Sequence, residues 1–467
     1  MKMWSGRFRQ PLDPEFERWQ RSFAFDRRLL KHELAASGAH ARALKDAGVL
    51  SSGELIAILQ GLEKIGKLAV ASSEFLEDSE AEDVHHFVEK QLVVLIGDTG
   101  YKLHSGRSRN EQIATDLRLY VRAAIVQQRA DLAEFARILV ERAEQAGNTA
   151  MPAYTHLQRA EPVLVSHWLL AYVEMFLRDA ERLADCRKRV NVCPLGSGAL
   201  AGATLPLDRS AMAADLGFDG PTSNSIDATS DRDFVLEFVN ILSLLALHLS
   251  RWAEEMILFS SQEFGFVHLP EAYSTGSSAM PQKKNPDLLE LARGKTGRVI
   301  GNATALMIAV KGLPLAYNKD LQETQEPLFE AAETARSLVP LATEWMKAVE
   351  FDYKRMQQAA QSGFMNAWAA ATYLVQRGVP FRLAHEQIGK AVQMCLDREC
   401  ELQDLPLDEL RSLNPVFDQD FYTCLMLDSV LAIHDVPGGT AVAQVRQAIA
   451  KAKQRIESIF EEVHAHA

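Results

Sequence analysis

Long stretches in which apolar residues recur at helical spacing constrain the fold of this chain more than any other feature of its sequence. Between residues 109 and 145, apolar side chains recur mostly three, four or seven residues apart, at Ile113, Leu117, Val121, Ile125, Leu132, Phe135 and Leu139. Similar patterns predict further long helices near 161–190, 230–262, 287–311 and 326–349. The alternation of polar and apolar residues that indicates strands is almost absent. We therefore predict an all-α protein built around a bundle of long helices.

The stretches on either side of these long helices look different from them. The first hundred residues predict short helices and loops, one of them started by a capping box between Ser51 and Glu54. After about residue 357 the predicted helices shorten again, with breaks at Gly378–Pro380 and Pro437–Gly439. We therefore predict three domains: an N-terminal helical domain (1–106), a central long-helix domain (107–357) and a small C-terminal helical domain (358–467).

Composition and charge exclude several classes of protein. With 47% hydrophobic and 24% charged residues, the chain has the make-up of a globular protein with a large core. No apolar run approaches the roughly 18 residues of a membrane span, and no signal-peptide segment follows the basic N-terminus. The five cysteines lack metal-ligand spacing and are typical of reduced thiols, so we expect a cytoplasmic protein. A net charge of −12 argues against a nucleic-acid partner.

One polar segment, from Gly276 to Asp287 and on to Glu290, matches no core or surface pattern. It contains paired serines, then two lysines, then an Asn-Pro pair at Asn285 and Pro286. This pair predicts the start of a helix with Asn285 as its N-cap. Hydroxyls, ammonium groups and the positive end of a helix would then lie together, which suits a site where negative charge develops. The alternative is a lysine-rich surface loop before a capped helix.

Other polar segments lie where the predicted long helices end, which is where a bundle carries its functional loops. They are His104–Gln112, Pro152–Arg159, Pro194–Gly198 and Asn224–Asp227. In the first of these, Ser108 and Glu111 form a Ser-x-x-Glu capping box. A phosphate loop at Gly294–Thr296 is excluded, because Leu289 stands where that motif requires a glycine.

Taken together, these segments resemble the argininosuccinate lyase family of the fumarase/aspartase superfamily. The segment from Gly276 resembles the superfamily signature, and His104–Gln112 and Tyr154–Arg159 point to the family. Matches at Trp4–Phe8, Asn224–Asp233 and Tyr317–Glu323 extend the resemblance over essentially the whole chain. It implies a carbon–nitrogen lyase of three-domain all-α fold, a homotetramer whose sites are shared between subunits, argininosuccinate as the substrate, and no cofactor, metal or membrane partner.

The implied reaction is the β-elimination of argininosuccinate to arginine and fumarate, the last step of arginine biosynthesis. A base removes a proton beside a carboxylate, and an acid protonates the leaving guanidino nitrogen, so the site must stabilise extra negative charge. By resemblance, Ser277 is the base and Lys283 and Asn285 hold the carboxylate and the intermediate. His156 is the second acid/base residue, oriented by Glu290. Which of Ser277 and His156 accepts and which donates the proton stays open in the sequence.

The resemblance assigns a further set of polar residues to substrate binding. With Asn285 they are Ser22, Ser108, Arg109, Asn110, Thr155, Arg232, Tyr317, Gln322 and Gln325. Two of them have simpler explanations, since Ser108 could act only as a helix cap and Arg232 only in a surface ion pair.

The chain departs from the family pattern at four positions. Glu161 stands for the usual Gln, Glu111 for Asp, Ser105 for Thr, and Gln325 for a substrate-binding Lys. The last departure removes a positive charge from the site and favours one rival interpretation, a superfamily member acting on a different N-succinyl compound. A second rival is an inactive structural protein, which the intact Ser277, Lys283 and His156 argue against.

Overall fold

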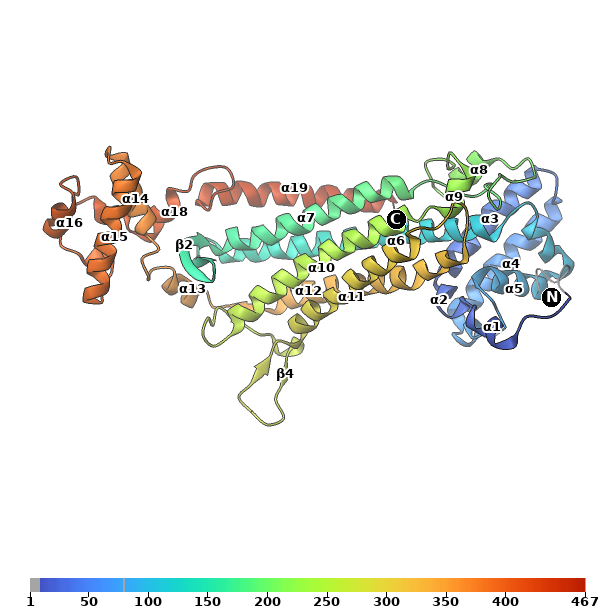
Figure 1. The fold of residues 1–467 in the computed structure, drawn as a ribbon, viewed down its shortest axis with the longest axis horizontal. Helices are drawn as coiled ribbons and strands as arrows, with labels where there is room; N and C mark the ends of the chain where they lie inside the picture. Colours follow the sequence, from blue (N-terminus) through green and yellow to red (C-terminus); the bar gives the residue numbers. More distant parts are fainter. Residues whose placement is uncertain (1–8, 79, 467) are drawn as a thin grey trace. The chain divides into compact units, whose positions relative to one another are not determined.

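The protein is almost entirely helical in a computed structural model that describes residues 9–78 and 80–466 (Figure 1). The predicted all-α fold is therefore confirmed, while the predicted segment Trp4–Phe8 lies outside the described residues. The helices form two compact units, each assembled from three stretches of the chain. Unit 1 comprises residues 1–127, 182–243 and 297–335, and unit 2 comprises residues 128–181, 244–296 and 336–467. The predicted three-domain division stays a prediction.

Five long helices correspond to the predicted ones, and each contributes residues to both units. They are α6 (Arg109–Ala146), α7 (Val165–Val190), α10 (Asp233–Ser260), α11 (Asp287–Val310) and α12 (Gln325–Ala348). In unit 2 they are tied together by large rings from four helices. Phe135 of α6 lies 4.8 Å from Phe176 of α7 and 5.6 Å from Trp252 of α10, between ring centroids. Trp252 in turn lies 5.3 Å from Trp345 of α12, so aromatic packing holds this part of the bundle.

Helix α10 corrects one expectation. By length and composition, it is the one helix in the described part of the chain that could cross a membrane, with a mean hydropathy of 1.5 over 18 residues. Half of that window is buried inside the protein, as in the core helix of a globular protein. The expectation that no stretch approaches a membrane span was too strict, because buried core helices reach the same hydropathy.

The remaining helices of unit 1 come mainly from the first hundred residues. They are α1 (Pro14–Trp19), α2 (Phe23–Asp26), α3 (Leu30–Asp46), α4 (Ser52–Ala71), α5 (Val84–Ile96), α8 (Arg209–Asp215) and α9 (Ser225–Ser230), with a 3₁₀ segment η5 (Lys319–Thr324). The predicted Ser51–Glu54 capping box starts α4. At 20 residues, α4 is longer than the short helices predicted for this region. Helices α4 and α5 approach closely at Gly61, where an added Cβ would meet Leu92 at 2.5 Å.

The remaining helices of unit 2 follow α12. They are α13 (Tyr353–Ala359), α14 (Ala367–Gln376), α15 (Phe381–Arg398), α16 (Leu407–Leu413), α17 (Phe421–Cys424), α18 (Leu427–Ala432) and α19 (Val442–His466). Tyr373, Phe417 and Phe421 form the aromatic centre of the smaller helices. The prediction that helices are short after residue 357 holds for most of them but is wrong for α15 and α19, which have 18 and 25 residues.

Three short antiparallel strand pairs lie in links between the helices, and two of them, β1–β2 and β4–β5, are hairpins in segments that the sequence presented as polar loops. The antiparallel pairs are β1 (Ala150–Thr155) with β2 (Gln158–Leu164), β3 (Val267–His268) with β6 (Glu350–Phe351), and β4 (Thr275–Gly276) with β5 (Lys284–Asn285). Because β2 occupies residues 158–164, α7 begins at Val165 instead of near 161. Strand β1 was missed because Pro152, which faces Pro162, removes a hydrogen-bond donor and interrupts the strand pattern.

Candidate active site

Most of the predicted substrate-binding residues of unit 1 line one cavity of about 130 Å³. They are Ser22, Arg109, Asn110, Tyr317, Gln322 and Gln325. These residues come from the start of α2, the first turn of α6, the segment around η5 and the first residue of α12. The cavity also includes Asp26, Asp83, His85 and Lys319, which were not predicted as binding residues because only the fold brings their segments together.

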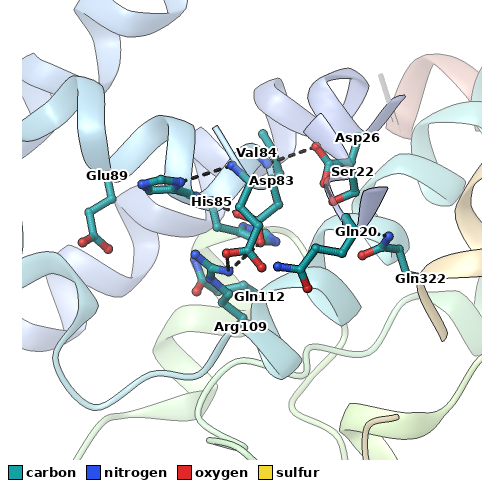
Figure 2. Close-up of polar contacts among 12 residues, drawn as sticks. Gln20, Ser22, Asp26, Asp83, Val84, His85, Glu89, Arg109, Gln112 and Gln322 are labelled. Atoms are coloured by element: carbon teal, nitrogen blue, oxygen red, sulfur yellow. Dashed lines mark hydrogen bonds and ion pairs between the residues drawn. The ribbon is translucent and has the colours of Figure 1, made fainter. Parts of the chain in front are cut away.

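The carboxyl of Asp26 lies on one side of this cavity. Ser22 Oγ donates to Asp26 Oδ2 at 2.6 Å, and the backbone N–H of Val84 donates to Asp26 Oδ1 at 3.0 Å (Figure 2). Burial, with a further contribution from the nearby charge of Asp83, raises the pKa of Asp26 to about 7. Asp26 is therefore a mixture of neutral and ionised forms near neutral pH.

Arg109 is held on the other side by two carboxylates. Figure 2 shows its guanidinium against Asp83, with Nη1 at 3.0 Å from Asp83 Oδ2 and at 3.3 Å from Glu82 Oε2. Although burial favours the neutral carboxyl, Arg109 and His85 hold the pKa of Asp83 below its usual range. Asp83 also accepts from the His86 N–H at the start of α5, so it caps that helix as well as fixing Arg109.

Arg232 is almost completely buried, which makes the surface ion-pair explanation wrong. Its side chain is 1% exposed, and Nη1 donates to the backbone oxygen of Asp231 at 2.7 Å. Nε and Nη2 have no hydrogen-bond partner within the described residues. Burial lowers the pKa of Arg232 to about 10, against the opposing influence of Tyr317 and Asp231. A buried guanidinium with two unused donors is suited to an anionic ligand.

Gln325 shows a related feature. Its side chain is 3% exposed, and Oε1 has no hydrogen-bond partner in the part of the chain that the structure describes. Gln322, one turn earlier, donates from Nε2 to the backbone oxygen of Gln20 at 3.2 Å. The position that departs from the family pattern therefore lies in the wall of the cavity, with spare hydrogen-bonding capacity.

Ser108 acts as a helix cap, which is one of the two roles considered for it, the other being substrate binding. The Asn110 N–H donates to Ser108 Oγ at 3.3 Å, and the Ser108 N–H donates to Glu111 Oε1 at 2.9 Å. Glu111 Oε2 also accepts from the N–H of Gly198 at 3.0 Å, which fixes the loop before α8. Asn110 donates from Nδ2 to the backbone oxygen of Ala199 at 3.2 Å. The cap thus positions the first turn of α6 at the cavity.

In unit 2, Thr155 and His156 lie at the tip of the β1–β2 hairpin. Thr155 pairs with Gln158, which leaves His156 and Leu157 as a two-residue turn. Both turn residues have left-handed backbones, with φ of 56° and 57°. A hairpin of this kind normally uses Asn-Gly or a similar pair, so the non-glycine turn stores strain of the kind often found at functional sites. The His156 side chain is exposed at this tip.

The segment from Gly276 forms a second exposed hairpin, which Figure 1 shows extending away from the C-terminal end of α10. Ser277 Oγ accepts from the backbone N–H groups of Ala279 at 3.3 Å and Met280 at 3.1 Å. Lys283 and Glu290 are exposed. The expectation for Asn285 was wrong, because it lies in β5 and its Nδ2 donates to Gly276 O at 3.4 Å. The cap position belongs to Pro286, whose carbonyl accepts the first helical bond from Glu290.

The predicted site residues thus fall into two sets that occupy different units. Unit 1 carries Ser22, Ser108, Arg109, Asn110, Arg232, Tyr317, Gln322 and Gln325, and unit 2 carries Thr155, His156, Ser277, Lys283, Asn285 and Glu290. Among the described residues of unit 2, no hydrogen bond or ion pair joins His156 to Ser277 or to Glu290. The predicted pairing of Glu290 with His156 is therefore not formed within one copy of the chain.

A cluster that the sequence did not reveal lies beside the unit 1 cavity. Glu33, His85 and Asp116 are all buried, and their nitrogen and oxygen atoms lie within 4.8 Å of one another. The spacing of these residues in the sequence did not indicate the cluster, because they belong to three different helices, α3, α5 and α6.

Comparison with known proteins decides the family. A family model described as Lyase matches residues 6–301, and one described as Argininosuccinate lyase C-terminal matches residues 364–432. The argininosuccinate lyase of Acidobacterium capsulatum is 61% identical over 97% of this chain and 94% of its own length. That of Koribacter versatilis is 58% identical over the full length of both. The chain belongs to the argininosuccinate lyase family. The predicted class, a carbon–nitrogen lyase of the fumarase/aspartase superfamily, is confirmed.

Solved structures of more distant proteins share the fold. An EDDS lyase variant with bound fumarate has a TM-score of 0.86 at 24% identity, covering 98% of this chain and 93% of that one. Fumarate lyase from Mesorhizobium sp. BNC1 has a TM-score of 0.73 at 19% identity, covering 94% and 100%. At these identities the comparison shows the common fold alone.

Proposed function

We propose that this member of the argininosuccinate lyase family splits argininosuccinate into arginine and fumarate by β-elimination. The observation that carries the proposal is the unit 1 cavity, which gathers six of the predicted binding residues. Its charged groups are mixed, with Arg109 and Lys319 suited to carboxylates and Asp26 and Asp83 suited to cationic groups. Argininosuccinate carries both kinds of group, so the charge pattern of the cavity fits this substrate.

Ser277 is the proposed base that removes the proton beside the succinyl carboxylate. A serine hydroxyl is a weak base, and its anion needs stabilisation before it can act. The backbone N–H groups of Ala279 and Met280 supply this, because both already donate to Ser277 Oγ. Lys283 and Asn285 follow in the same segment and hold the carboxylate into which the extra charge spreads.

His156 is the proposed acid that protonates the leaving guanidino nitrogen, and Glu290 of another copy orients its ring. The strained turn at the hairpin tip presents the imidazole to the surroundings of the chain instead of to its own core. Histidine suits proton transfer at neutral pH because its ordinary pKa is about 6.5. Thr155, beside it, contributes to holding the substrate.

The proposed enzyme is a cytoplasmic homotetramer whose sites combine residues from different copies. Support for assembly comes from α11, which exposes Leu291, Ile300, Met307 and Ile308. Beside Gly294, Gly297 and Gly301 of the same helix, an added Cβ would meet nothing within 4 Å in the described chain. An apolar helix face with small residues allows close approach of a second helix, and a closed tetramer would cover it.

A fumarate-release assay with a panel of N-succinyl substrates tests this function. We expect the highest kcat/KM for argininosuccinate and a mass in light scattering near four times the 51.9 kDa chain. A higher kcat/KM for another N-succinyl compound would support the rival enzyme, and no fumarate from any of them would support the structural protein.

A further inference from the structure

A buried network of side chains lies behind the unit 1 cavity. It contains Glu33 of α3, His85 of α5 and Asp116 of α6, which are 0%, 5% and 0% exposed. Of the three, His85 also lines the cavity. This network touches the proposed substrate site through His85, while the two carboxyl groups lie deeper in the protein.

Glu33 is surrounded by donors. Its Oε2 lies 3.0 Å from His85 Nδ1, and its Oε1 accepts from Ser37 Oγ at 2.6 Å and from Gln112 Nε2 at 3.1 Å. Arg107 Nη2 lies 3.7 Å from the same Oε1. Although burial opposes ionisation, His85 and Arg107 lower the pKa of Glu33 to about 2. Glu33 is therefore an ionised carboxylate whose hydrogen bonds are well satisfied.

Asp116 is equally buried but lacks such donors. Neither of its oxygens has a hydrogen-bond donor within the described residues, and His85 Nδ1 lies 3.7 Å from Oδ2. A buried carboxylate without donors is costly, and the neighbouring charge of Glu33 adds repulsion. Burial and Glu33 raise the pKa of Asp116 well above its ordinary value. A proton on Asp116 removes both penalties and lets its O–H donate to Glu33, as in other pairs of neighbouring carboxyl groups.

We propose that Asp116 is a positioning residue whose neutral carboxyl donates its O–H to Glu33, so that Glu33 stays fixed against His85 Nδ1. The ring is then held with its other nitrogen, Nε2, available to the cavity. This nitrogen is buried and has no partner within the described residues, which leaves it for a ligand. The proposal rests on the proposed function, because the cavity is the proposed substrate site.

Glu33 and Asp83 favour the protonated ring of His85. Although burial opposes protonation, these two carboxylates raise the pKa of His85, and the imidazolium form has an Nε2–H that can donate to a substrate carboxylate. Other charged or titratable groups that act on the network are Asp26, His40, Asp83, His104 and Arg107. The neutral carboxyl of Asp116 donates a hydrogen bond to the negative charge of Glu33, and it adds no second negative charge beside it.

Two substitutions test whether Asp116 acts as a neutral hydrogen-bond donor or as an ionised carboxylate. Asp116→Asn keeps a neutral side chain with an N–H donor for Glu33, and we expect kcat/KM within about threefold of the natural protein. Asp116→Leu removes the donor, and we expect kcat/KM to fall by about tenfold or more, mainly through KM. Glu33 then attracts the His85 proton more strongly, so the limb of the pH profile due to His85 moves to higher pH by about half a unit or more. Thr115→Val is the matched control, because Thr115 is a buried residue of the same helix whose hydroxyl donates to Glu111 O, and we expect this variant to keep the His85 limb of the pH profile unchanged.

Several results would overturn the proposal. If Asp116→Asn loses as much activity as Asp116→Leu, Asp116 acts as an ionised acceptor. If both variants keep the natural activity and pH profile, Asp116 positions nothing. A stoichiometric divalent ion in the purified protein would also overturn it, because the ion would take the place of the proton.

A spectroscopic readout covers the case in which Asp116→Leu fails to fold. In an isotope-edited infrared difference spectrum between the natural protein and Asp116→Asn, we expect loss of the carbonyl band of a neutral carboxylic acid. No such band in the natural protein would overturn the proposal. This measurement needs no turnover, so it distinguishes a failure of the Asp116 proposal from a failure of the proposed lyase function.

Discussion

The unit 1 cavity and the two exposed hairpins of unit 2 hold their functional side chains in opposite ways. In the cavity, side chains hold side chains: Asp83 fixes Arg109 and Ser22 bonds to Asp26. On the hairpins, the backbone does the positioning, through two N–H groups at Ser277 and a left-handed turn at His156. The proposed binding groups of the cavity are thus buried or half-buried and are held by partners in the same unit, whereas the proposed proton-transfer groups lie on exposed hairpins.

This difference indicates a division of labour. Buried, mutually paired charges keep a fixed arrangement before substrate arrives, which lowers the ordering cost of binding. Exposed groups on short hairpins can be brought to the substrate and shielded from water only when another surface covers them. The comparison therefore predicts that changes on the hairpins affect kcat, while changes in the cavity affect KM, stability or both.

The largest expected effect is on the hairpin of Ser277. Ser277→Ala removes the hydroxyl that accepts both backbone N–H groups, and we expect kcat to fall by at least ~10² while the assembled protein persists. Ser278→Ala, the neighbouring serine, is the matched control and is expected to cost far less. Steady-state kinetics on both variants give the answer, and a natural kcat for Ser277→Ala would remove Ser277 from the mechanism.

The buried guanidinium of Arg232 provides the next test. Arg232→Met removes a buried charge with two unused donors, so we expect kcat/KM to fall by roughly 10- to 100-fold, mostly through KM, since a charged hydrogen bond is worth about 1.5–3 kcal/mol. The free energy of unfolding should change by less than ~1 kcal/mol, because replacing an unpaired buried charge is not destabilising.

Arg118→Met is the control for Arg232. Arg118 is also buried, but it pairs with Asp231 and donates to the backbone oxygens of Arg189 and Val190. Its loss should therefore destabilise the protein by about 3–5 kcal/mol, because Asp231 is left without its partner. Equal destabilisation by the two substitutions would show that Arg232 is structural.

Much of the fold could be predicted from the sequence, but much less of the site. The long helices were predictable because Ile113, Leu117 and Val121 repeat one buried face over many turns. The His156 turn could not be predicted, because the His-Leu pair has none of the residues that usually indicate a hairpin turn. The cavity could not be predicted either, because Asp83 looks like an ordinary acidic residue of a first helical turn until the fold brings Arg109 against it.

Asp26 makes the stability of the cavity depend on pH. Its pKa is about 7 in the folded protein and 3.8 ordinarily, so the unfolded chain releases this proton first and folded-state stability falls as pH rises toward 7. Asp26→Asn does not titrate, and its advantage in free energy of unfolding over the natural protein should grow by ~2 kcal/mol between pH 5 and pH 8. Denaturant unfolding at equal protein concentration measures this, and a constant difference across that range would contradict the raised pKa.

The smallest expected effect belongs to Gln325. A lysine there would restore a charged contact to the substrate but would enter a buried position in a cavity that already contains Lys319. We expect Gln325→Lys to improve kcat/KM for argininosuccinate by less than about tenfold, or ~1.4 kcal/mol. If the natural protein prefers another N-succinyl compound and Gln325→Lys switches it to argininosuccinate, the proposed substrate is wrong.

The central claim, that a working site needs groups from different copies of the chain, is tested most directly by complementation. His156→Asn and Ser277→Ala are each expected to be inactive, and both changes lie on exposed hairpins outside the core. After dissociation, mixing in equal amounts and reassociation, activity should recover to about a quarter of the natural level, because each site then draws its two residues independently. No recovery in hybrid tetramers verified by mass would contradict the claim and place both residues of a site in one copy.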